Sequence, residues 1–238
     1  MHCLMELARG VVQWNLKPAK QRLKENAQRF CRKTGPLVIF ERRGYMDLLL
    51  KCTTVFKHLL QFRYCFVLGR KNIKKEIILG FDETDFHHLV GLHKLKDISI
   101  ARANRQKVFR DILSGLITYQ TIQKSSYAEE CISRLSTFQY IEKFLDSDQL
   151  IFKYNSRNYP GSLIRSEYLL KFDLEIAERP SFLFIDQRDG DLYFCRTFFP
   201  LGKIDYSFHQ MQYTLLRKEK IKLDTGIVEV QFDRLGIN

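Results

Sequence analysis

The sequence contains no apolar run approaching the ~20 residues that a membrane-spanning helix requires. It also begins without a signal-peptide pattern, because Glu6 and Arg9 interrupt what would have to be an apolar segment. We therefore expect a cytoplasmic protein that has no membrane partner.

Several catalytic and cofactor motifs are also missing. The 6 cysteines are scattered without CxxC spacing, so we expect small buried thiols and no disulfide framework. There is no Walker loop, no glycine-rich dinucleotide turn and no GxSxG nucleophile elbow, and we expect no cofactor. His88 and His93 are five positions apart, about 140° around a helix, which is the wrong spacing for a shared metal ion. We expect no metal site.

The sequence is rich in apolar, aromatic and basic residues. Of its 238 residues, 45% are hydrophobic and 13% aromatic, which is typical of a folded chain. Lys and Arg number 39 against 27 acidic residues, for a formal charge of +12. Such an excess favours polyanionic partners such as RNA, although a basic surface without any partner would have the same composition.

The pattern of elements predicts an α+β fold. Residues 1–62 read as an N-terminal helical extension, with helices before and after Pro18 and a stop at Gly35-Pro36. Residues 63–238 read as the core domain, in which several strand pairs are separated by turn signals. The predicted hairpins are 63–68 with 76–81, 181–186 with 192–199, and 213–222 with 227–232. We expect a helical N-terminal half packed on an antiparallel sheet of about four or more strands.

An arginine interrupts an otherwise apolar helical face in the middle of the chain. The face is formed by residues at 4-3-4-3-4 spacing, which predicts one helix of about five turns: Tyr127, Cys131, Arg134, Phe138, Ile141 and Leu145. An arginine that faces the core needs an anion or a hydrogen-bond network, because burying it unpaired is costly. A structural ion pair and a phosphate contact both remain open for Arg134.

The stretch from Phe81 to Leu95 holds three of the six histidines, His87, His88 and His93. Asp82 and Asp85 have the N-cap and N3 spacing that begins a helix. Gly91 inside that helix would cost about 1 kcal/mol relative to alanine. We expect another part of the chain or a ligand to approach the backbone closely beside His88.

This stretch carries a resemblance to a known family. Its residues are Phe86, His88, Leu89, Gly91, Leu92, Leu95, Asp97 and Ile98. Further matching segments follow in order: 107–115, 125–127, 132–138 and 213–221. Together they resemble the phage-associated branch of the barnase–EndoU–colicin–RelE-like nucleases over roughly residues 64 to 234. The resemblance implies a toxin-type ribonuclease from a phage or mobile element, with RNA as substrate and an antitoxin or immunity protein as a further partner.

Metal-independent RNA cleavage needs a base, an acid and cations that hold the developing phosphorane charge. His88 is the first candidate, because imidazole titrates near neutrality and the resemblance falls on it. Arg134 is the candidate for phosphate binding. His93 reads first as a structural residue, since it falls on the apolar stripe. The resemblance adds polar residues of the sheet, because sites of this family draw on them. The full set of candidates is therefore His88, Arg134, Lys153 and Tyr168 for catalysis, and Arg196, Thr197 and His87 for nucleic-acid binding.

Three functions fit the sequence. The first is a metal-independent endoribonuclease-like protein that acts by acid–base catalysis. The second is a non-catalytic nucleic-acid- or protein-binding module of a phage, in which the histidines only pack. The third is a structural phage accessory protein with no role in nucleic-acid binding.

Overall fold

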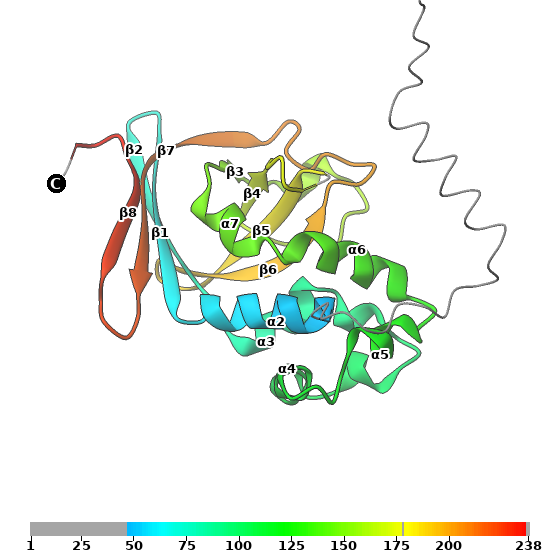
Figure 1. The fold of residues 1–238 in the computed structure, drawn as a ribbon. Helices are drawn as coiled ribbons and strands as arrows, with labels where there is room; N and C mark the ends of the chain where they lie inside the picture. Colours follow the sequence, from blue (N-terminus) through cyan, green and yellow to red (C-terminus); the bar gives the residue numbers. More distant parts are fainter. Residues whose placement is uncertain (1–46, 178, 237–238) are drawn as a thin grey trace, which may run out of the picture. The chain divides into compact units, whose positions relative to one another are not determined.

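In the computed structural model, seven β-strands close into a barrel and an eighth strand extends the sheet beyond it (Figure 1). The structure describes residues 47–177 and 179–236. The helices predicted before residue 47 lie outside the described residues, and the domain boundary predicted at residue 62 stays a prediction. The strands are β1 (Phe62–Arg70), β2 (Ile73–Gly80), β3 (Leu150–Lys153), β4 (Tyr168–Phe172), β5 (Ser181–Asp189), β6 (Leu192–Pro200), β7 (Met211–Lys222) and β8 (Val228–Asp233).

Barrel closure depends on β7. Its first residues pair with β3, and most of its length pairs antiparallel with β1. On the other side of β1, β2 pairs with β6 in parallel, at Ile78 with Leu192. The order β1-β2-β6-β5-β4-β3-β7 therefore returns to β1, and β8 pairs with β7 outside the ring.

The predicted fold class, a helical N-terminal half packed on an antiparallel sheet of about four or more strands, is wrong. The sheet closes on itself, and one of its pairings is parallel. The reason is that β2–β6, β3–β7 and β1–β7 join strands far apart in the chain. Sequence patterns report neighbouring strands, whereas such pairings depend on the packing of the whole core.

The three predicted hairpins are confirmed. β1 and β2 meet at a two-residue turn, Lys71-Asn72, whose φ angles of 46° and 63° suit the twist of the flanking strands. The β5–β6 hairpin turns at Gly190, with φ 52°, and the β7–β8 hairpin turns at Gly226, with φ 67°. Both glycines occupy the left-handed conformation that L residues rarely adopt.

The described helices are short. They are α2 (Leu48–Leu59), α3 (Glu83–Leu89), α4 (Arg105–Leu113), α5 (Tyr119–Gln123), α6 (Ala128–Phe138) and α7 (Ile141–Asp146), with 3₁₀ turns η1 (Leu92–Lys94), η2 (Ser99–Arg102) and η3 (Ser156–Asn158). The five-turn helix predicted around Arg134 is wrong, because Tyr140 leaves the helical conformation at φ −106° and ψ 8°. The chain bends at this residue, so the predicted helix is divided into α6 and α7. Within the described ranges no helix is long and apolar enough to cross a membrane.

Two apolar clusters hold these elements together. The larger one runs from the helices into the barrel, where Phe56, Phe86 and Phe138 are fully or almost fully buried. The smaller one contains Phe152, Tyr154, Leu169, Phe182 and Phe184, and loop residues pack against it. Barrel strands thus contribute to both clusters. Strand β6 also contacts α3 and α6, so it lies beside both helices.

Candidate functional site

Helix α3 begins with the predicted capping box. Asp82 Oδ1 accepts a hydrogen bond from Thr84 N at 2.9 Å, and Asp85 Oδ2 accepts one from Asp82 N at 3.1 Å. These carboxylates satisfy backbone donors that a helix start leaves free. Burial raises the pKa of Asp85 to about 6, while Arg188, 3.6 Å away, acts in the opposite direction. The start of the histidine segment is therefore fixed by its own sequence.

The helix ends earlier than its pattern predicts, and this brings two histidines together. α3 stops at Leu89, and Gly91 takes the left-handed conformation with φ 84° before η1 begins. The chain therefore turns between His88 and His93, and their ring centroids lie 4.3 Å apart. The predicted separation of about 140° around one helix is wrong, because no single helix contains both residues.

Gly91 also allows a close approach, as its position predicted. A Cβ at residue 91 would lie 3.0 Å from Cδ and 3.3 Å from Nε of Arg134. The first distance is shorter than most real Cβ contacts, and the positive φ adds strain for any L residue. The residue that approaches the backbone is thus Arg134 of α6. Gly91 is needed both for the left-handed turn and for the close packing of the Arg134 side chain.

The Arg134 guanidinium is held in place by neutral oxygens. Nη1 donates to the Phe198 carbonyl at 2.8 Å, to Thr197 Oγ1 at 3.2 Å and, more weakly, to the Leu89 carbonyl at 3.4 Å. The side chain is 8% exposed, and burial lowers its pKa. Glu130, the carboxylate that acts on it electrostatically, is itself ion-paired with Lys94. A guanidinium remains charged under these conditions, so Arg134 presents a fixed positive charge.

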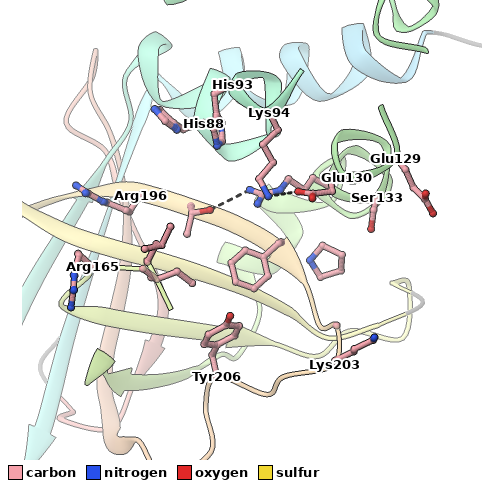
Figure 2. A pocket seen from close by; sticks show the side chains of 17 residues that line it. His88, His93, Lys94, Glu129, Glu130, Ser133, Arg165, Arg196, Lys203 and Tyr206 are labelled. Atoms are coloured by element: carbon pink, nitrogen blue, oxygen red, sulfur yellow. Dashed lines mark hydrogen bonds and ion pairs between the residues drawn. The ribbon is translucent and has the colours of Figure 1, made fainter. Parts of the chain in front are cut away.

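These side chains share one pocket of about 1040 Å³ (Figure 2). His88, His93 and Lys94 come from α3 and η1, while Ser133 and Arg134 come from α6. The remaining wall comes from the end of β6 and from loop residues, namely Leu163, Ile164, Arg165, Arg196, Thr197, Phe199, Pro200, Gly202, Lys203 and Tyr206. Among the described lining residues, five cations (Lys94, Arg134, Arg165, Arg196 and Lys203) face two carboxylates (Glu129 and Glu130). The pocket is suited to a phosphorylated ligand.

Both pocket histidines are neutral at physiological pH. Burial and then the Arg105 charge lower the pKa of His88 to about 4. Burial and then His88 lower the pKa of His93 to about 4. His93 Nδ1 is buried without a hydrogen-bond partner among the described residues. Two unprotonated imidazoles beside a fixed guanidinium can accept protons from a bound ligand.

The other predicted site residues divide into two groups. Arg196 and Thr197 line the pocket with His88 and Arg134. His87 does not, since it is 2% exposed and its Nε2 lies 3.0 Å from the Ile100 carbonyl. Lys153 and Tyr168 are also outside the pocket lining. Lys153 pairs with Glu167 at 2.6 Å and lies 4.7 Å from the Tyr168 ring centroid.

Sequence reasoning missed part of the pocket. His93 read as a packing residue, and only the turn at Gly91 brings it beside His88. Lys94 is adjacent to it and could have been found by the same signal. Lys203 and Tyr206 lie in a loop without a motif, so no sequence signal marked them. No three His, Cys, Asp or Glu side chains of the described ranges gather closely enough to hold a metal ion.

The comparisons with known proteins agree with the expected family. Neither the curated proteins nor the solved structures contain a match to this chain. A family profile does match, over residues 48–235, and its description is phage-Barnase-EndoU-ColicinE5/D-RelE like nuclease4. The matched region contains every residue that lines the pocket. The chain therefore belongs to this family of phage nucleases.

Proposed function

We propose that the protein is a toxin-type endoribonuclease that cleaves RNA without a metal ion, in the pocket between α3, α6 and the end of β6. The observation that carries the proposal is the convergence of His88, His93 and Arg134 on one basic pocket. Membership of a phage nuclease family supports the same class of reaction. Lys153 and Tyr168 do not line this pocket, so we assign them no role in the proposed reaction.

The reaction proposed is an attack of the ribose 2′-oxygen on the adjacent phosphorus. His88 accepts the 2′-OH proton, a bond forms between that oxygen and phosphorus, and the bond from phosphorus to the 5′-oxygen breaks. The leaving 5′-oxygen is protonated by solvent water, because His93 is unprotonated in the free enzyme, and His88 then gives its proton to the hydroxide that this leaves. Arg134 stabilises the charge that develops on the phosphate oxygens. The products are a 2′,3′-cyclic phosphate and a 5′-hydroxyl.

Cleavage in the presence of a chelator tests this proposal. We expect the full-length chain to fragment single-stranded RNA in excess EDTA and to leave DNA of the same sequence intact, because DNA has no 2′-OH. Gel electrophoresis of both polymers over time measures the result. RNA that stays intact, or DNA that is cut equally, would contradict the proposed chemistry.

The pKa of the histidines predicts an unusual pH dependence. A general base must be unprotonated in the free enzyme, and His88 stays so until the pH falls through about 4. We therefore expect kcat/KM to fall on the acid side near pH 4, well below the ordinary imidazole pKa of about 6.5. Initial rates between pH 3.5 and 9 measure this limb, with circular dichroism confirming that the fold persists.

Arg105 provides a matched variant for the pH profile, because its charge is the first of the electrostatic causes that lower the pKa of His88. It does not line the pocket. Arg105→Gln should raise that pKa and move the acid limb to higher pH while the rate on the plateau is kept. An acid limb near pH 6.5 in the wild-type protein would contradict a lowered pKa of the base.

A further inference from the structure

The pocket has an aromatic floor opposite its histidines. Phe199 and Tyr206 both line it, with ring centroids 5.6 Å apart and ring planes at 73°. Figure 2 shows Tyr206 across the cavity from His88 and His93. The phosphate chemistry proposed above uses neither ring, so this floor needs its own explanation.

The Tyr206 ring is held rigidly. It contacts Tyr159, Phe182 and Phe184 at centroid distances of 5.0, 6.1 and 5.7 Å, in addition to Phe199. These rings belong to the smaller apolar cluster, which is built on the barrel strands. Tyr206 itself is only partly buried, so part of its ring is open to the cavity. The surrounding rings restrict the rotation of this ring.

The aromatic floor and the cationic site touch each other. The guanidinium carbon of Arg134 lies 5.5 Å from the centroid of the Phe199 ring. A nucleotide whose phosphate lies at Arg134 can therefore reach the aromatic surface with its base. Leu163 and Ile164 add apolar wall to the same cavity, and Leu163 is 92% exposed. An apolar, rigid surface beside a phosphate site fits a nucleobase.

We infer that the pocket binds one unpaired nucleotide, its base stacked on the Tyr206 ring and its phosphate at Arg134. The substrate of the proposed nuclease is therefore single-stranded RNA. A base within a duplex is stacked and paired, so it cannot reach this floor without being extruded. Aromatic stacking accepts any base, which predicts weak sequence preference at this position. The inference rests on the proposed function, and it adds the structural class of the substrate.

Binding of uncleavable strands tests the inference. The probes are a fluorescent twelve-residue 2′-O-methyl RNA, the same strand in a duplex, and an abasic strand of equal length and charge. Fluorescence anisotropy with the full-length protein gives the dissociation constants. We expect the single strand to bind about 5- to 150-fold more tightly than the abasic strand, because only the former can stack. This comparison needs no protein variant.

A substitution on the protein side completes the test. Tyr206→Leu keeps an apolar side chain in the cluster and removes the aromatic face. It should weaken binding of the single strand by a similar factor and leave the abasic strand unaffected. Phe208→Leu is the matched control, since Phe208 belongs to the same loop, is 65% exposed and does not line the pocket. It should change neither value more than twofold.

The outcomes separate this inference from the proposed function. Wild-type protein that binds the duplex or the abasic strand as tightly as the single strand overturns the stacking floor. So does a Tyr206→Leu variant that binds the single strand normally. In either case RNA cleavage in EDTA would still support the nuclease. Protein that binds no strand and cuts no RNA overturns both.

Discussion

His88→Ala is expected to reduce RNA cleavage by about 10²- to 10⁴-fold, the range typical of a lost general base. The physical reason is that His88 is one of two neutral imidazoles in the pocket, placed beside the fixed charge of Arg134. Alanine leaves the capping box of α3 untouched, because Asp82 and Asp85 form it. The measurement is the initial rate of cleavage of a single-stranded RNA, together with a far-UV spectrum that should be unchanged.

His58→Ala is the matched control for this prediction. His58 lies on α2, its side chain is 50% exposed, and it pairs with Glu142 rather than lining the pocket. Its loss should leave the cleavage rate within about twofold of wild type. If His88→Ala retained wild-type activity, His88 would have no role in the chemistry and the site would need another base.

Arg134→Met is expected to reduce both activity and stability. The variant removes the pocket cation that holds the developing phosphate charge, which costs about 10²- to 10³-fold in rate for a single lost donor. It also leaves the buried Phe198 carbonyl without its 2.8 Å donor, at a cost of about 1–3 kcal/mol in the free energy of unfolding. Cleavage kinetics and urea denaturation measure the two effects separately.

A second variant of Arg134 and a control variant show whether rate and stability depend on the charge of Arg134 or on its planar geometry. Arg134→Lys keeps the charge but loses the planar fork, so we expect partial recovery of stability and little recovery of rate. Arg110→Met removes one charge from α4, where Arg110 is largely exposed and only loosely paired with Glu83, and it should leave both properties near wild type. Full activity in Arg134→Met would reduce Arg134 to a structural residue of the β6–α6 junction.

The local parts of the fold were predictable from the sequence. Asp82 and Asp85 marked the start of α3, and turn residues marked the hairpins, because caps and tight turns depend on a few neighbouring residues. The barrel was not predictable in this way. Its closure needs β1 to pair with β7 and β2 with β6, and these contacts join residues more than a hundred positions apart.

The candidate site was predicted in part for the same reason. His88 and Arg134 stood out because a histidine cluster and a core-facing arginine each need a chemical explanation, and they do share a pocket. His93 was misread because its position was projected onto a helix that ends at Leu89. A glycine inside a helical pattern also indicates a helix end, and that reading of Gly91 would have placed His93 correctly.

The aromatic floor lies beyond local reasoning altogether. Tyr206 belongs to a loop after β6, and nothing in its neighbouring sequence distinguishes it from other tyrosines. Its position follows from packing against Tyr159, Phe182 and Phe184, which come from other segments. Sites assembled by a closed barrel draw on loops that are distant in sequence, so the pocket could be completed only from the structure.

The chemical identity of the product ends is the most direct test of the central claim. The full-length protein would be incubated with a synthetic single-stranded RNA in EDTA, and the fragments analysed by mass spectrometry. The proposed cleavage yields 2′,3′-cyclic phosphate and 5′-hydroxyl ends, and a strand with 2′-deoxyribose at the cut position should resist. Fragments with 5′-phosphate ends, or RNA that is bound in a salt-dependent manner yet never cut, would contradict it.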